Sequence, residues 1–210
     1  MKNLLIILSL TASINLTSCS SKKSSNEQKP KEASTPSETK KEEAVIIQKQ
    51  SEPDTLKGSL KAEAIGKIGD TEIKVSYHSP AVRGRIVWGG LVPFDKVWVA
   101  GAHMATSIEF NNDLVIDGKT IPAGKYAFFT IPGKDEWTII INKNWQQHLT
   151  DKYDAKEDVV RVKVKPETEE PHQERLRYEI EADSKIQGEI VVYWEKLEIS
   201  LPVSLKKLFV

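Results

Sequence analysis

The residues best suited to binding a ligand lie in one glycine- and arginine-rich stretch, where Arg83 and Arg85 flank Gly84 and Trp88 follows. A guanidinium offers a planar pair of donors to a carboxylate or a sugar, and an indole offers a face for stacking. The alternative is that the arginines pair with surface carboxylates while the glycines serve tight turns. We predict a site for a small polar ligand or glycan formed by Arg83, Arg85, Trp88, Trp98 and His103.

The histidines suggest a second kind of chemistry. The chain has four, and imidazole is the commonest metal ligand in proteins. In a β-sandwich His78 and His103 could approach each other, and Met104 would suit a soft metal such as Cu(I). Neither a His-x-His nor an HExxH spacing is present. A metal site at His78 and His103, serving a metal-assisted hydrolase, is therefore the alternative to a simple binding site.

Other catalytic chemistries lack a motif in this sequence. There is no Gly-x-Ser-x-Gly elbow and no phosphate-binding loop, the usual marks of nucleophilic or nucleotide chemistry. A pair formed by Ser79 and His103 would depend on geometry alone. No cofactor is expected, and we favour a protein that is not an enzyme. The acidic residues nearest the distinctive segments have no spacing that specifies a catalytic pair: Asp95, Glu109, Asp158 and Glu195.

Cys19 is the only cysteine, and it follows a short apolar segment at residues 4–10 that begins after Lys2. The apolar segment is too short to cross a bilayer, which takes about 20 residues, and it fits a cleaved signal peptide. Leu16-Thr-Ser-Cys19 resembles a bacterial lipobox. We predict a signal peptide at 1–18 and diacylation of Cys19 with chains such as palmitate. The alternative is an ordinary secretory peptide with a chance cysteine.

The residues after Cys19 predict location and organisation. Ser20 is not the Asp that retains lipoproteins in the inner membrane of Gram-negative bacteria, so we expect an outer-membrane anchor facing the periplasm. Residues 19–57 are rich in Ser, Lys, Glu and Pro, which predicts a flexible linker with the lipidated Cys at its start. Residues 58–210 are long enough for one domain. The net charge of zero offers no footprint for nucleic acid.

The domain is predicted to consist of strands. Apolar and polar residues alternate at 71–77, 160–165, 176–180 and 197–203, a pattern typical of strands with one buried face. Segments 126–131 and 137–141 are more uniformly apolar and suggest central strands. Asp117-Gly118 predicts a hairpin turn, and residues 145–153 are the best candidate for a short helix. The fold class expected is all-β, an antiparallel, jelly-roll-like sandwich.

A series of distinctive segments runs in order along the domain, at 77–85, 89–94, 96–98, 101–102, 121–126, 129–132, 136–137, 142–143, 158–162, 193–195 and 201–203. Together they resemble domain-of-unknown-function family 2911, whose members are typically exported bacterial proteins and often lipoproteins. The resemblance covers most of the domain, implies a β architecture and an envelope location, and implies no reaction. One segment departs from the family pattern, because residues 99–104 read Val-Ala-Gly-Ala-His-Met.

Three functions remain open at this point. The first is a membrane-anchored module that binds a small polar ligand, a glycan, a peptide or an envelope protein. The second is the metal-assisted hydrolase, and the third is a purely structural envelope lipoprotein.

Overall fold

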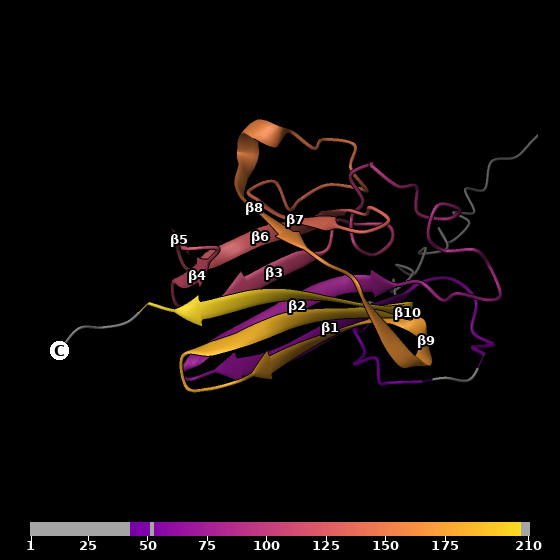
Figure 1. Cartoon of the computed structure of the whole chain (residues 1–210), viewed down its shortest axis with the longest axis horizontal. Coiled ribbons are helices and arrows are strands. Elements are labelled where there is room, and N and C mark those ends of the chain that lie inside the picture. The colour runs from indigo at the N-terminus through magenta and orange to yellow at the C-terminus, as the bar shows by residue number, and fades with distance from the viewer. Residues whose placement is uncertain (1–42, 51–52, 207–210) are drawn as a thin grey trace, which may run out of the picture. The chain divides into compact units, whose positions relative to one another are not determined.

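The structure is a computed structural model that describes residues 43–50 and 53–206. Two antiparallel sheets form a sandwich, so the predicted β-sandwich is confirmed. The larger sheet has the order β1-β2-β3-β6-β7-β8, and the smaller has the order β5-β4-β10-β9 (Figure 1). The strands are β1 (Leu60–Ile68), β2 (Thr71–Ser79), β3 (Ser107–Phe110), β4 (Leu114–Ile116), β5 (Lys119–Ile121), β6 (Gly124–Ile131), β7 (Trp137–Asn142), β8 (Asp158–Val164), β9 (Glu167–Ala182) and β10 (Gln187–Leu205).

The residues at the turns determine where the chain forms hairpins. Asp117 and Gly118 connect β4 to β5 with φ values of 49° and 71°, the left-handed pair that a tight two-residue hairpin turn requires. The hairpin predicted at these two residues is therefore confirmed. The longest hairpin joins β9 to β10, which Figure 1 shows as neighbouring orange and yellow strands.

The interior of the larger sheet is buried on both faces. Phe128 of β6 faces the smaller sheet and joins the main core. Phe129 points the other way and packs with Ile140 of β7 in a second apolar cluster on the outer face, which is covered by loop residues that include Trp145 and Tyr153. This double coverage explains why β6 and β7 are almost uniformly apolar.

The core between the sheets is filled at one end by indoles. Trp137 and Trp194 are each 1% exposed, and the ring of Trp88 lies 4.8 Å from that of Trp137 and 5.6 Å from that of Trp194. Trp98 stacks on Trp194 at 5.7 Å with an interplanar angle of 17°. Large aromatic side chains in contact contribute strongly to a core of this size.

Residues before β1 seal one edge of the sandwich. Val45 forms a parallel bridge with Ala62 of β1, and Ile47 is buried in the core. Gln173 of β9 donates to the carbonyl oxygen of Gln48 and accepts from the backbone N–H of Gln50. Within the predicted linker 19–57, the described residues 43–50 and 53–57 therefore include several that pack on the domain.

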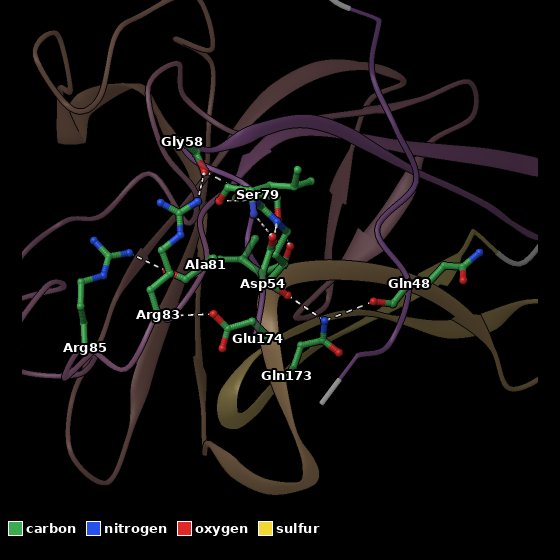
Figure 2. A network of polar contacts seen from close by, with 12 residues as sticks. Gln48, Asp54, Gly58, Ser79, Ala81, Arg83, Arg85, Gln173 and Glu174 are labelled. Atoms are coloured by element: carbon green, nitrogen blue, oxygen red, sulfur yellow. Dashed lines mark hydrogen bonds and ion pairs between the residues drawn. The ribbon is translucent and has the colours of Figure 1, made fainter. Parts of the chain in front are cut away.

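A buried ion pair also holds the residues before β1 against the sandwich. The guanidinium of Arg175, on β9, pairs with the carboxylate of Asp54, and their side chains are 2% and 7% exposed. Arg175 also donates to the carbonyl oxygens of Ser79 at 2.8 Å and Leu56 at 3.3 Å. Figure 2 shows these contacts converging from the N-terminal residues, β2 and β9.

The helix predicted at 145–153 is wrong. These residues form turns and an isolated bridge, and the only helical element within the described ranges is the short 3₁₀ helix η1 (Ala155–Glu157). The backbone of this segment hydrogen-bonds to another loop, because the carbonyl oxygen of Gln147 accepts from the N–H of Ala105 at 2.9 Å. No helix among the described residues is long and apolar enough to span a membrane.

Replacing Asp54 with Ala should lower the free energy of unfolding by roughly 3–5 kcal/mol, because it leaves the buried Arg175 cation without its counter-charge. Urea denaturation of the full chain measures the change. The matched control is Glu72→Ala, which breaks an exposed ion pair with Lys67 at 4.0 Å and should cost about 1 kcal/mol or less. Equal effects of the two substitutions would contradict the assignment of Arg175 as a buried, charge-dependent anchor.

Candidate functional site

The candidate site lies on the outer face of the larger sheet, where β1, β2 and β3 run side by side. Ser76 and His78 occupy outward positions on β2, alternating with the buried Val75 and Tyr77. Register places Ser107 of β3 opposite Ser76 and Lys61 of β1 opposite His78. Two small hydroxyl side chains and one imidazole thus lie on neighbouring strands, at a place where the small serines leave room for a ligand.

Two loops cover the adjoining part of this face, at residues 99–106 and 143–153. They are joined by an antiparallel bridge between Met104 and His148. The N–H of Leu149 donates to the carbonyl oxygen of His103 at 2.7 Å. Val99 and Ala105 of the first loop pack into the outer apolar cluster defined above. The covering loops are therefore anchored by both backbone hydrogen bonds and apolar burial.

The first loop is fixed from inside the sandwich as well. The hydroxyl of Tyr178, on β9, donates to the carbonyl oxygen of Ala100 at 2.7 Å, and the hydroxyl of Thr106 donates to the same oxygen at 3.1 Å. The indole N–H of Trp98 donates to the carbonyl oxygen of Gly101 at 3.1 Å. Ala100 has φ 49°, a conformation that costs a residue with a side chain about 1–2 kcal/mol and is held here by these contacts.

The second loop is fastened to β8. Tyr153 donates its hydroxyl proton to the carboxylate of Asp158 at 2.8 Å, and Arg161 donates to both groups. Burial and the bond to Asp158 raise the pKa of Tyr153 to about 12. The phenol therefore stays protonated and donating at neutral pH, and the loop keeps this attachment throughout the physiological range.

Between these loops and strands lies a cavity of about 390 Å³. Its size falls within the range of small-molecule sites, which are concave, mostly apolar and contain a few placed polar groups. Trp145, Met104 and Ala105 provide apolar wall, and the cavity contains no carboxylate among its lining side chains. The lining residues are Lys61, Ser76, Tyr77, His78, Met104, Ala105, Ser107, Trp145 and Gln146.

Charged side chains of both signs lie around the cavity, and the carboxylate of Glu63 accepts from the hydroxyl of Ser76 at 3.3 Å. Lys61 is exposed at one side. The ammonium of Lys125 lies 4.3 Å from the ring centre of Trp145 and 3.6 Å from a carboxylate oxygen of Glu109. The cation over the indole fixes one face of that ring through a cation–π contact.

The predicted metal residues come together. The rings of His78 and His103 are 5.2 Å apart between their centres, with an interplanar angle of 81°. His78 lines the cavity beside Met104, the residue after His103. No group of three or more His, Cys, Asp or Glu side chains with the spacing of a metal site occurs within the described ranges.

The predicted arginines lie elsewhere and contact the protein itself. The N–H of Arg83 donates to the carboxylate of Glu174 at 2.7 Å, and its guanidinium donates to the carbonyl oxygen of Gly58 at 3.3 Å. Arg85 donates to the carbonyl oxygens of Ala81 and Val82, which belong to its own loop. Figure 2 shows both arginines beside the Glu174 network, and neither lines the cavity.

The predicted tryptophans belong to the core. Trp88 and Trp98 pack against the buried cluster around Trp137 and Trp194, and neither lines the cavity. Trp145 is the indole that does. The sequence did not single out Ser76, Ser107, Lys61 or Gln146; the one available signal was a pair of small polar residues at outward positions of two strands.

Replacing Gly101 with Ala should disturb the imidazole pair. A Cβ atom there would lie 2.7 Å from the hydroxyl oxygen of Thr106, closer than real Cβ contacts, and 3.1 Å from the carbonyl oxygen of His78, which is tighter than most. In proton spectra of the full chain we expect the His78 and His103 ring signals to shift and the melting temperature to fall by a few degrees. The His172 signal, from a ring bonded to Glu174, is the internal control. Unmoved His78 and His103 signals would contradict the close packing of this loop.

Comparison with known proteins identifies a family for this chain but no individual relative. No curated protein and no solved structure matches the chain significantly. Residues 59–203 match the family described as "Protein of unknown function (DUF2911)", and this range contains every residue that lines the cavity. Because the match covers more than half of the chain, the protein belongs to the DUF2911 family.

Proposed function

We propose that the protein is a lipid-anchored envelope protein that binds a small, ring-bearing polar ligand in the cavity on the outer face of the larger sheet. The observation that carries the proposal is the cavity itself, which combines the face of Trp145 with the hydroxyls of Ser76 and Ser107 and the ammonium of Lys61. A purely structural sandwich has no need for this combination on a solvent-facing surface.

The chemistry of the lining suggests the class of ligand. An indole binds the flat face of an aromatic ring or a sugar, serine hydroxyls can both donate and accept, and a lysine ammonium favours an anionic group. No lining residue is a carboxylate, but the hydroxyl of Ser76 donates to the carboxylate of Glu63 at 3.3 Å. The anionic group of a ligand is therefore expected beside Lys61, away from Glu63. Aromatic acids and acidic sugars fit this description best.

The support for pre-organisation comes from the loops. The bridge between Met104 and His148 and the hydrogen bond from Tyr178 to Ala100 fix the cavity walls before any ligand arrives. Binding in a pre-formed site avoids the entropy cost of ordering side chains and loops.

The anchor is supported by the sequence alone. Cys19 and the predicted signal peptide 1–18 lie outside the described residues. Two acyl chains on one cysteine hold a protein stably at a membrane, where one chain is marginal. A tether from Cys19 would present the domain to ligands in the space beside the outer membrane.

A metal-assisted hydrolase is the second candidate, because the imidazoles of His78 and His103 lie 5.2 Å apart between ring centres. Catalytic zinc sites use three protein ligands and a water molecule. Zinc-dependent hydrolysis of a chromogenic ester, lost in His78→Ala and His103→Ala, would favour this function over simple binding.

Ligand binding is tested by titrating the full lipoprotein in detergent with benzoate and, separately, with glucuronate. Trp145→Ala should weaken binding of the preferred probe by about tenfold or more, a loss of about 1.4 kcal/mol, because it removes the stacking face. Lys61→Ala should weaken binding of both acids. Leu91→Ala, at an exposed apolar residue that does not line the cavity, is the control. Equal affinity of Trp145→Ala and the control would place binding elsewhere.

Anchoring is tested by Cys19→Ser, which removes the acylated thiol. The wild-type protein should incorporate labelled palmitate and sediment with membranes, whereas the variant should do neither. Ser20→Asp should retain the label but move the protein to the inner-membrane fraction. Palmitate incorporation by Cys19→Ser would contradict lipidation at this residue.

A further inference from the structure

The two imidazoles beside the cavity come from separate parts of the chain. His78 extends outward from β2, and His103 belongs to the covering loop 99–106. Their ring centres are 5.2 Å apart and their planes meet at 81°. An edge-to-face aromatic pair has this geometry, and so does a pair of histidines that share a metal ion.

The separation matches a shared metal quantitatively. A metal-to-nitrogen bond is about 2.0–2.1 Å long, and the ring centre lies about 1.1 Å further, which puts each ring centre roughly 3 Å from the metal. Two such rings at angles between tetrahedral and linear are then roughly 5–6 Å apart. The observed separation of 5.2 Å between the ring centres falls within this range.

Met104 supplies a third donor of a particular chemical kind. It lines the same cavity wall as His78, directly follows His103 in the chain, and leaves 45% of its surface exposed. A thioether is a soft ligand that selects Cu(I), and imidazole also suits copper. Hard cations such as Ca²⁺ and Mg²⁺ prefer carboxylates, and the cavity lining has none.

Two residues of the covering loops have a left-handed backbone. His103 has φ 60° and its hydrogen-bonded neighbour Leu149 has φ 44°. Left-handed conformations at such residues cost free energy and persist where the surroundings fix them, often at functional sites.

We propose that His78, His103 and Met104 bind one Cu(I) ion through two imidazole nitrogens and the thioether sulfur. The inference deepens the proposed function, because the ion lies at the wall of the same cavity and offers an open side to a ligand there. The site holds the ion in the reduced state, and no redox step is required.

The test uses the full chain carrying Cys19→Ala, which removes the only thiol. Cu(I) is supplied as its bicinchoninate complex, and competition gives stoichiometry and affinity. The methionine methyl groups are labelled with ¹³C for NMR, since Met104 and Met1 are the two methionines. We expect one Cu(I) per chain and a shifted Met104 methyl signal.

Variants assign the donors. His78→Ala and His103→Ala should each weaken Cu(I) binding by about 100-fold or more, since loss of even an outer-shell partner costs 10–100-fold. Met104→Leu, which keeps the shape but removes the sulfur, should weaken it by about tenfold. His172→Ala is the matched control, because that ring bonds to Glu174 and does not line the cavity. If His78→Ala does not fold, His78→Gln takes its place, and its melting temperature is measured to show that this variant is folded.

Several results would overturn the site: no Cu(I) retained by the Cys19→Ala chain, an unmoved Met104 methyl signal, or equal losses in His172→Ala and His78→Ala. If the Cys19→Ala chain binds benzoate or glucuronate but retains no Cu(I), the copper site is overturned and the proposed function stands. If the same chain binds Cu(I) but neither acid, the copper site stands and the proposed binding of acidic ligands is overturned.

Discussion

The structure depends on the burial of one positive charge, the guanidinium of Arg175. A buried cation must be paired and hydrogen-bonded, because an unpaired one costs several kcal/mol or more. Arg175 meets this need with the carboxylate of Asp54 and with the carbonyl oxygens of Ser79 and Leu56. These partners come from residues before β1 and from the end of β2, so a single side chain on β9 ties both sheets to the N-terminal residues (Figure 2).

This anchor bears directly on the site, because Ser79 adjoins His78. The end of β2 is held by Arg175 at the carbonyl oxygen of Ser79 and by the hydroxyl of Ser79, which donates to the carbonyl oxygen of Leu176 at 2.6 Å. On the other side, Gly101 packs against the backbone of His78. The imidazole is therefore carried by a strand end that is fixed from two directions, as a site needs if it is to keep a geometry.

Much of the fold could be predicted from local pattern. The alternation of apolar and polar residues predicted strands, the uniformly apolar segments predicted the central strands β6 and β7, and Asp117-Gly118 predicted a hairpin. The alternation at 176–180 misled in one respect, because it assigned Arg177 to a wet face. Arg177 is 2% exposed, and its guanidinium lies 3.9 Å from the ring centre of Tyr193. The period of two reports which residues share a face, but it carries no information about the side chain on the neighbouring strand, here Tyr193 opposite Arg177, that covers one of them.

The site was predictable only in part, for a similar reason. The sequence brought His78 and His103 together by assuming a sandwich, and the structure places their rings in contact. Trp88 and Trp98 had the right chemistry for a platform, but an indole is equally a core residue, and their packing against Trp137 and Trp194 is decided by long-range topology. Trp145 lines the cavity because its loop pairs with residues 103–105, a contact that no local pattern encodes.

The filling of the core explains why the cavity is outside it. The space between the sheets at the end near β7 and β10 is occupied by four contacting indoles, and a close-packed interior leaves no room for a ligand. The hollows among the described residues accordingly lie outside this indole core: one is the cavity beneath the loops, and another is lined by residues that include Val45, Leu56 and Arg175. The loops 99–106 and 143–153 form the wall of the first cavity over β2 and β3. The loop 99–106 is tied to that core, because the indole N–H of Trp98 donates to the carbonyl oxygen of Gly101, so the packing of the core also fixes the position of the cavity wall.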